Sequence, residues 1–344
     1  MAATPAGAAS PGPTPGAIAD GGAGSTAAAA GEVPGPELVA LLTGRYGLSD
    51  RQVSQLATYL DYMLEINQSM NLTAVRDKAD AWQRHVVDSL ALLPVLERHA
   101  QQAGLGGARA GTGAGTVAGA SGLRRVGTGS RSEVGAGEAA VEGAADASVE
   151  SGSDRARSSE GASGSGAAAA VVDAGLRLRL VDVGTGAGLP GMVLAAARPQ
   201  WKVTLLDSLR KRCDFLREAA ARAGLSNVDV VWCRAEEGGH RPELRQAYDV
   251  AVARAVAEAR VLAELCLPFV RVGGLWLAAK GPDPEAEVTA AASAIRQLGG
   301  RQLALERVES YSSEGQRTAL LVAKSGPTPQ RFPRAPGTPG KKPL

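Results

Sequence analysis

The sequence predicts an α/β fold: a doubly wound, mostly parallel sheet that ends in an antiparallel hairpin and is preceded by a small helical region. Three observations predict it. From residue 176 onward, short apolar runs alternate with helix-like segments, a pattern typical of parallel β-α units. The last two apolar runs have no helix between them, which favours an antiparallel pair. Residues 34–100 instead carry apolar positions at helical spacing.

Composition divides the 344 residues into five parts. Residues 1–33 are almost wholly Ala, Gly, Pro, Ser and Thr, and residues 101–175 are rich in Ala, Gly and Ser. Such segments bury too little apolar surface to offset the entropy lost on ordering. We therefore expect a disordered extension and a flexible insertion that separates the helical region, 34–100, from the sheet core, 176–325. Residues 326–344 form a basic tail rich in Pro and Gly.

Two helices are predicted in the region before the insertion. Ser49 and Gln52 have the spacing of a capping box, and apolar residues at helical spacing follow them. A second amphipathic segment covers 79–93, and Pro94 is its expected stop. The polar residues 71–77 between the two helices are predicted to form a loop.

The core is predicted to alternate strands and helices. Ser208 should cap its second helix, and Gly224 should end that helix. Strands are expected at 178–183, 203–207, 228–232, 249–253, 275–279, 303–308 and 319–323, with helices at 190–197, 208–223, 257–270 and 284–298.

Composition and cysteine spacing restrict the class of protein. The net charge of +2 says little about partners. Three cysteines without a CxxC pair argue against a metal site or a disulfide framework and favour a reducing compartment. The chain lacks a signal peptide pattern and an apolar run of about 18 residues. We therefore expect a cytoplasmic monomer that binds neither metal nor membrane.

The turn Gly184–Gly191 follows the first predicted strand and indicates a ligand site. Glycine permits positive φ and leaves no Cβ between the backbone and a ligand. The helix after the turn presents free N–H groups, and ligands of open α/β sheets bind at the carboxyl ends of the strands. Four glycines in eight residues make a connection without a ligand the weaker interpretation.

Two ligands fit this turn. Gly186, Gly188 and Gly191 satisfy the dinucleotide fingerprint, so NAD(P) stays open. The strand ends just before Gly184, however, which gives a G-x-G-x-G turn. Asp182 lies two residues before it, as in methyltransferases. This register favours S-adenosylmethionine.

Two acidic positions follow the next strands. Asp207 ends the second strand, where a carboxylate can accept hydrogen bonds from both ribose hydroxyls; NAD sites use the same device. A favourable charge at the start of the following helix is the alternative role for Asp207. Glu236 follows the third strand and could meet an adenine amino group, or it could be a solvated surface residue.

A family resemblance becomes specific at Leu180–Gly191, with the sequence LVDVGTGAGLPG. This stretch resembles the signature of the RsmG family, also called glucose-inhibited division protein B. These bacterial class I methyltransferases act on guanine N7 in small-subunit ribosomal RNA. The resemblance covers about 34–100 and 176–344. Further matching segments are Asn71–Asp77, Arg84–Leu90, Leu205–Ser208, Lys211–Arg212, Phe215–Leu216, Arg234–Glu237, Tyr248–Ala255, Ala279–Gly281 and Phe332–Leu344.

The resemblance implies a class I methyltransferase fold, S-adenosylmethionine as cofactor and a set of cofactor contacts. Gly186 and Gly188 are included because they belong to the glycine turn. Leu189 could equally serve packing, and Arg254 could instead hold the edge of the sheet. The remaining implied contacts are Gly184, Asp207, Ser208, Leu209, Ala235 and Glu236.

The resemblance also implies 16S rRNA or the assembling 30S subunit as partner. From Lys324 to the C-terminus there are five basic residues and no acid, so the tail could contact phosphates or merely aid solubility. Arg84 could instead pair with Asp88 at i,i+4, and His85 could be structural. The RNA-binding candidates are Arg76, Arg84, His85, Arg331, Arg334, Lys341 and Lys342.

Guanine N7 carries a lone pair and no proton. It can therefore attack the methyl group directly and in line, so no general base is expected and no catalytic residue is assigned. Two other functions stay open at this point. One is an NAD-dependent oxidoreductase, and the other is a non-catalytic RNA-binding protein with the same fold.

Overall fold

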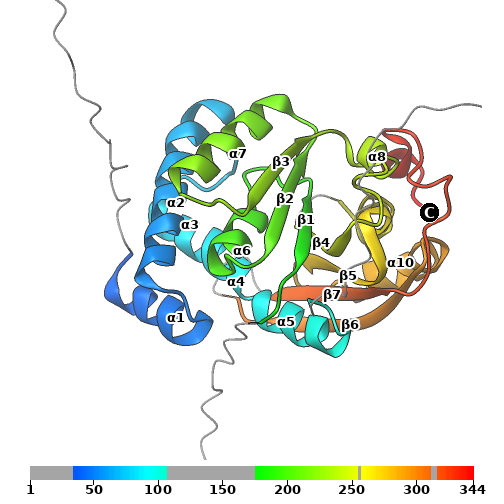
Figure 1. Cartoon of the computed structure of the whole chain (residues 1–344), viewed down its shortest axis with the longest axis horizontal. Coiled ribbons are helices and arrows are strands. Elements are labelled where there is room, and N and C mark those ends of the chain that lie inside the picture. The colour runs from blue at the N-terminus through cyan, green and yellow to red at the C-terminus, as the bar shows by residue number, and fades with distance from the viewer. Residues whose placement is uncertain (1–33, 107–174, 255–256, 311–315) are drawn as a thin grey trace, which may run out of the picture. The chain divides into compact units, whose positions relative to one another are not determined.

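A seven-stranded sheet lies at the centre of the computed structural model (Figure 1). Its order is β3-β2-β1-β4-β5-β7-β6, and β1 to β5 pair in parallel. β7 is antiparallel to both of its neighbours, β5 and β6. The strands are β1 (Arg179–Val183), β2 (Lys202–Asp207), β3 (Val228–Trp232), β4 (Tyr248–Arg254), β5 (Val270–Lys280), β6 (Gly300–Val308) and β7 (Arg317–Lys324).

The predicted sheet is confirmed, including its closing antiparallel hairpin. The strand order also distinguishes this sheet from the dinucleotide-binding sheet. The dinucleotide-binding sheet runs 3-2-1-4-5-6, whereas here an antiparallel strand, β7, lies between β5 and β6. The chain order reverses between β1 and β4, so ligands are expected above the carboxyl ends of these strands.

The structure describes residues 34–106, 175–254, 257–310 and 316–344. The predicted disordered extension, 1–33, and most of the predicted insertion, 107–174, lie outside the described residues. The described helices are α1 (Pro36–Tyr46), α2 (Asp50–Met70), α3 (Lys78–Ala81), α4 (Asp88–Leu90), α5 (Leu93–Gln102), α6 (Gly191–Ala197), α7 (Arg210–Arg222), α8 (Ala235–Gly238), α9 (Ala259–Cys266), α10 (Glu285–Gln297) and α11 (Thr338–Lys341).

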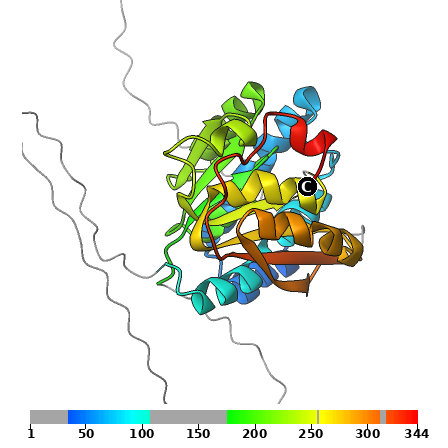
Figure 2. The same ribbon diagram turned by 90° about the vertical axis from the view of Figure 1, so that its right-hand side faces the viewer.

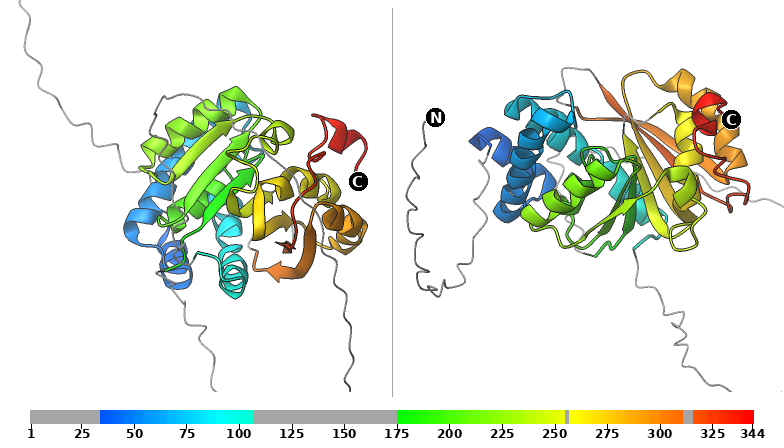
Figure 3. Two further views of the ribbon diagram at one scale, coloured as in Figure 1. Left: turned by 45° about the vertical axis from the view of Figure 1, so that its right-hand side comes forward. Right: turned by 90° about the horizontal axis from the view of Figure 1, so that it is seen from above.

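Helices cover both faces of the sheet (Figure 3). Strand residues alternate between two apolar clusters, because neighbouring side chains of a strand point to opposite faces. Leu180 packs in the cluster that contains the N-terminal helices, α6 and α7, whereas Val181 and Val183 pack in the cluster that contains α9 and α10. The C-terminal segment, red in Figure 2, adds Phe332 to this second cluster. None of the described helices is long and apolar enough to cross a membrane.

The capping box at the start of α2 is confirmed, because Ser49 and Gln52 exchange the expected hydrogen bonds. The second predicted helix differs. α3 passes into a π-helical segment, Trp82–Val87, and then into α4. Pro94 does not stop a helix; it lies in the first turn of α5. Proline is tolerated there because the N–H it lacks would have no helical partner.

The start of α7 also differs from the prediction. Its N-cap is Leu209, and no side chain caps it, so Ser208 is not the cap. Asp207 takes part of that role, since its Oδ1 accepts a hydrogen bond from the Leu209 N–H at 2.8 Å. The helix predicted at 257–270 is shorter: α9 gives way to a 3-10 turn, Leu267–Phe269.

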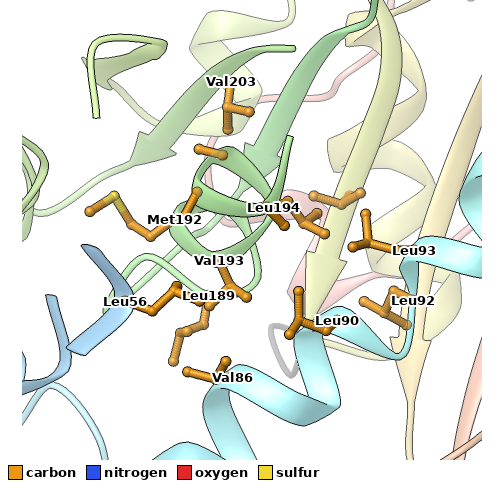
Figure 4. Packing of buried hydrophobic residues seen from close by; sticks show 14 of the residues in the cluster. Leu56, Val86, Leu90, Leu92, Leu93, Leu189, Met192, Val193, Leu194 and Val203 are labelled. Atoms are coloured by element: carbon orange, nitrogen blue, oxygen red, sulfur yellow. The ribbon is translucent and has the colours of Figure 1, made fainter. Parts of the chain in front are cut away.

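α6 packs between the sheet and the N-terminal helices (Figure 4). Met192 and Leu194 of α6 are fully buried, as is Leu90 of α4. Truncating a buried Leu to Ala typically costs about 2–5 kcal/mol. The N-terminal helices therefore hold α6, and with it the glycine turn from which α6 begins.

Candidate functional site

A pocket of about 740 Å³ lies at the carboxyl ends of the parallel strands. Two separate parts of the chain line it. The ends of β1, β2 and β4 and the segment after β3 provide one side. The loop and helices between Leu72 and Leu92 provide the other, together with the end of β5 and the start of β7. The helical region and the core therefore both contribute to the pocket lining.

The glycine turn forms one wall of the pocket. Its first two N–H groups, on Gly184 and Thr185, donate to Leu206 O at 2.9 and 3.2 Å. Gly186 has φ +62°, and a Cβ built on it would find only Gly184 O, at 4.0 Å. A side chain there would point into open space that lies within the pocket lining. This is a cradle in which a ligand can approach the backbone.

Gly188 has a different role. A Cβ on Gly188 would lie 2.6 Å from Met192 Cγ and 2.9 Å from Leu216 Cδ2, and Gly188 does not line the pocket. Gly191 is similarly close to Leu205. The structure therefore places Gly188, a predicted cofactor contact, in the packing of the turn against the helices.

Asp182 stabilises the turn through two hydrogen bonds. Its Oδ2 accepts hydrogen bonds from Thr185 Oγ1 at 2.6 Å and from Gly191 N–H at 2.8 Å. Burial raises the pKa of this carboxyl to about 6, although these hydrogen bonds and the nearby Arg254 favour the anion. Asp182 therefore positions the first residue of α6, and its Oδ1 has no hydrogen-bond partner among the described residues.

Asp207 is fixed at the end of β2, where it lines the pocket. Its Oδ2 accepts from Gly186 N–H at 3.0 Å, its Oδ1 accepts from Leu209 N–H at 2.8 Å, and Arg212 Nη1 lies 3.6 Å from Oδ2. A carboxylate has about four lone-pair positions, so both oxygens retain acceptor capacity for further donors. Two neighbouring hydroxyls are such donors.

The remaining predicted cofactor residues lie around Asp207. Leu209 is 52% exposed, which leaves apolar surface open at the pocket. Ala235 and Glu236 begin α8, and Glu236 Oε1 accepts a hydrogen bond from Gly337 N–H at 3.0 Å. Except for Gly188, all predicted cofactor residues line the pocket: Gly184, Gly186, Leu189, Asp207, Ser208, Leu209, Ala235, Glu236 and Arg254.

Arg254 ends β4 and reaches toward the N-terminal helices. Its Nη1 donates to Arg84 O at 3.3 Å and to Ser89 Oγ at 3.2 Å. Burial lowers the pKa of this guanidinium, and the nearby Tyr59 and Asp182 counteract that effect. Arg254 therefore links the sheet edge to the helices and also lines the pocket, so the two roles considered for it are compatible.

The opposite wall carries two groups held by hydrogen bonds. His85 Nε2 lies 3.0 Å from Thr73 Oγ1. Asp88 is buried; its Oδ2 accepts from Arg317 Nε at 3.1 Å and its Oδ1 from Ser310 Oγ at 3.1 Å. The partner of Asp88 is thus an arginine from β7, more than two hundred residues away in sequence.

The other RNA-binding candidates lie outside the pocket lining. Arg76 donates to Asn71 Oδ1 at 2.8 Å and to Asn67 O, which closes the loop after α2. Arg334 binds the buried Glu264, with Nη2 2.6 Å from Oε2. Arg334 therefore anchors the tail to α9, an internal role that the sequence did not indicate.

The remaining tail candidates are exposed. Arg331 stacks over the ring of Phe332 at 4.9 Å, and Lys341 and Lys342 lie at the end of α11. Lys324, by contrast, is only 1% exposed at the end of β7, so the basic tail is not uniformly solvated.

Several pocket residues were not singled out from the sequence: Thr73, Arg212, Arg234, Lys280 and Arg317. Arg212, Arg234 and Lys280 belong to segments that carried the family resemblance, and their position after strand ends was the available signal. Arg317 had no local signal. The described residues contain no group of acidic, His and Cys side chains that could hold a metal ion.

Comparison with known proteins gives a family match. The family model GidB, described as rRNA small subunit methyltransferase G, matches residues 52–117 and 165–316. These ranges include most residues of both sides of the pocket. Among solved structures, the antibiotic-resistance methyltransferase Kmr aligns with 44% of this chain and 88% of its own, at 21% identity and a TM-score of 0.36. A structural likeness this distant adds no argument about function.

Curated relatives match along most of the chain. The ribosomal RNA small subunit methyltransferase G of Alkaliphilus metalliredigens is 33% identical over 299 residues, 87% of this chain and 93% of that protein. The protein of the same name from Moorella thermoacetica is 32% identical over 297 residues, 86% of this chain and 92% of its own. That from Symbiobacterium thermophilum is 48% identical over 185 residues, 52% of this chain and 74% of that protein.

Proposed function

The chain belongs to the GidB family, rRNA small subunit methyltransferase G, and on this premise we propose that it transfers the methyl group of S-adenosylmethionine to N7 of a guanine in 16S rRNA. One observation carries the proposal. The glycine turn and the strand-end acid expected to hold the cofactor share one pocket with basic residues from the N-terminal helices and β7.

S-adenosylmethionine supplies a methyl group on a positively charged sulfur. Asp207 would accept hydrogen bonds from the ribose hydroxyls with its remaining lone pairs. The open space at Gly186 lets a ligand lie against the backbone, and the exposed face of Leu209 would cover the adenine. Glu236 would accept a hydrogen bond from the adenine amino group. These residues fit the cofactor in type and in place.

The opposite wall would receive the RNA. Arg84 and Arg317 line it, and Arg254, from the end of β4 on the other side, reaches it through hydrogen bonds to Arg84 O and Ser89 Oγ. Guanidinium groups bind phosphate oxygens and base edges, and they stay cationic at neutral pH. We infer that the target guanine enters between the N-terminal helices and the end of β4, where His85 and Asp88 border the pocket.

Direct attack by N7 needs no residue to remove a proton. Four side chains of the pocket lining have hydrogen-bond contacts within the protein, and we assign them positioning roles. Asp88 binds Arg317, Asp207 binds the turn, Glu236 binds Gly337 N–H and His85 lies against Thr73. Catalysis would then rest on holding the reacting atoms in line, about 3–3.5 Å apart.

The test is transfer of labelled methyl from S-adenosylmethionine to naked 16S rRNA and to 30S particles, with binding of NAD(H) measured in parallel. The proposal expects label in at least one RNA substrate and no measurable NAD(H) binding. Label in neither substrate, with RNA bound tightly, would instead support the non-catalytic RNA-binding alternative. Sedimentation of the active sample tests the proposed monomeric state.

A further inference from the structure

An exposed tryptophan lies at the rim of the pocket. Trp232 ends β3 and is 51% exposed. The large apolar side chains exposed within the described ranges are Leu209, Trp232, Val272 and Leu303. Two of them, Leu209 and Trp232, lie at the carboxyl ends of neighbouring strands. Large apolar side chains exposed together at one edge of a sheet often mark a binding surface.

The indole ring of Trp232 is held in place. Its Nε1 donates to Ser208 O at 3.1 Å, and the guanidinium carbon of Arg210 lies 5.4 Å from the ring centre. Trp232 is the register partner of Asp207 in the sheet. Ser208, whose carbonyl accepts the indole hydrogen bond, and Arg234, two residues further along the chain, line the pocket, whereas Trp232 itself does not. The ring therefore forms a preorganised surface just outside the pocket.

Positive charge lies beside this ring. The first turn of α7 contains Arg210, Lys211 and Arg212 and no acidic residue. The helix dipole disfavours cations at this end, so the arrangement does not serve the stability of α7. The nearest acid on the same helix, Asp214, lies 3.9 Å from Arg210 and is itself bound by Arg217 at 2.9 Å. Arg212 is paired with Asp207 at 3.6 Å, so an anionic partner would pair with Arg210 and the exposed Lys211.

We propose that Trp232, Arg210 and Lys211 form a docking surface for a single-stranded segment of RNA next to the target guanine. One unpaired base would stack on the indole of Trp232, and the neighbouring phosphates would contact the two cations. Proteins commonly bind unpaired RNA in this way, with bases on aromatic rings or guanidinium planes. The inference rests on the proposed RNA substrate and adds a second contact outside the pocket.

Tryptophan fluorescence tests the stacking directly, without methyl transfer. The chain has four tryptophans, and the other three, Trp82, Trp201 and Trp276, are buried. Acrylamide should therefore quench mainly Trp232. An unstructured oligoadenylate should lower the emission of Trp232 and shield it from acrylamide, and Trp232→Phe should abolish both effects. Oligoadenylate that binds, by an independent measure such as anisotropy, without changing the emission overturns the proposal.

A second experiment measures the contribution of the ring to substrate binding. Trp232→Ala should raise the KM and Kd for 16S rRNA about 5- to 150-fold and leave the Kd for S-adenosylmethionine unchanged, whereas Trp232→Phe should retain most of the affinity. Val272→Ala is the matched control, since Val272 is 46% exposed but lies near the start of β5, away from the carboxyl ends of the strands. Lys211→Ala should weaken binding and reduce its salt dependence.

The outcomes separate the inference from the proposed function. If Trp232→Ala loses cofactor affinity and keeps RNA affinity, the ring covers the adenine and the docking surface is refuted. If it loses only self-association, the ring is a contact between copies of the chain, which also refutes it. If the native protein binds RNA through Trp232 but transfers no methyl group, the proposed function fails and the docking surface stands.

Discussion

Asp207 combines two tasks in one carboxylate. It anchors the turn through Gly186 and Leu209, and its remaining lone pairs are the proposed ribose contact. We expect Asp207→Ala to weaken S-adenosylmethionine binding about 10- to 100-fold, because hydrogen bonds to a charged group contribute about 1.5–3 kcal/mol. Calorimetric titration measures this directly. Asp207→Asn should lose less, because an amide oxygen can still accept one of the backbone bonds.

Asp229→Ala serves as the control for this prediction. Asp229 is an exposed acid on β3 that does not line the pocket. Equal cofactor affinity in the native protein and in Asp207→Ala would show that Asp207 does not contact the cofactor. A similar loss in Asp229→Ala would show that overall charge, rather than this contact, controls binding.

Two glycines of the same turn should respond differently to substitution. Gly186→Ala points a methyl group into the pocket and strains a residue at φ +62°, so the free energy of unfolding should fall by only about 1–2 kcal/mol. Its cofactor affinity should fall at least about tenfold. Gly188→Ala meets Met192 and Leu216, so its loss of stability should be larger, roughly 2–5 kcal/mol.

Urea unfolding and cofactor titration of both glycine variants check this division. The account is contradicted if Gly186→Ala binds the cofactor as well as the native protein does, or if Gly188→Ala is the more stable of the two. Such a result would indicate that the ligand lies against another part of the turn rather than against Gly186.

For single residues, local sequence pattern was enough to bring the glycine turn, Asp207, Arg84 and His85 to one predicted site, and all of them contribute to the pocket lining, but it gave no sign of the long-range pairs. The glycine turn and Asp207 are close in sequence to strand ends, so local pattern was enough to place them. Arg317 reaches Asp88 only because β7 lies antiparallel between β5 and β6. Arg334 meets Glu264 in the same non-local way. No periodicity along the chain encodes such pairs.

Among the elements, β7 carries a buried lysine at its end. Lys324 Nζ donates to Leu298 O at 2.7 Å and to Thr328 Oγ1, and it is 1% exposed. Burial, with a smaller effect of Arg245, lowers the pKa of Lys324 from 10.5 to about 7. This side chain ties the C-terminal tail to the end of α10.

The lowered pKa predicts how stability depends on pH. Between about pH 7 and 10.5 the unfolded chain holds a proton on Lys324 that the folded chain lacks. The free energy of unfolding should therefore rise with pH in this window, by at most about 1.4 kcal/mol per pH unit. Lys324→Met should flatten that rise, since Thr328 Oγ1 can still donate to Leu298 O.

Urea unfolding of the native protein and of Lys324→Met at pH 7.5, 8.5 and 9.5 measures the slope. Lys202→Met replaces an exposed lysine of β2 and should leave the slope unchanged. Parallel pH dependence in native protein and Lys324→Met would show that Lys324 remains protonated in the fold.

Element types were predictable because each strand and helix carries its own period of apolar residues. Element ends were less predictable. Pro94 begins α5 rather than ending a helix, and Leu209 rather than Ser208 precedes α7. Both boundaries have local reasons: proline is tolerated in a first helical turn, and Asp207 Oδ1 already accepts a hydrogen bond from the Leu209 N–H group. The position of β7 inside the sheet depends instead on long-range pairing.

For the whole molecule, the first part of the predicted insertion, 101–175, differs from the prediction: α5 extends to Gln102 and Leu105 is buried. The described residues on the two sides of 107–174 lie side by side. A Cβ on Gly106 would be 2.6 Å from Leu176 Cδ1 and 2.8 Å from Arg177 N. A short linker can therefore replace residues 108–173. If these residues act as a flexible insertion, shortening them to about eight removes roughly three doublings of loop length, which predicts a gain of about 2 kcal/mol in the free energy of unfolding.

Cofactor affinity and methyl transfer should survive this deletion. Both are measured on the shortened protein after its fold is verified by circular dichroism and urea unfolding. If the shortened protein folds but no longer transfers the methyl group, residues 108–173 take part in substrate binding. That result would contradict the prediction of a flexible insertion.

In the reaction that we propose, one pocket, built from the glycine turn and the N-terminal helices, holds a guanine N7 against the cofactor's methyl group. The most direct test is to digest rRNA after transfer from methyl-labelled S-adenosylmethionine and to identify the labelled nucleoside by chromatography and mass spectrometry. The account predicts 7-methylguanosine at a single site of 16S rRNA. Label on another base, or on another atom of guanine, would contradict it.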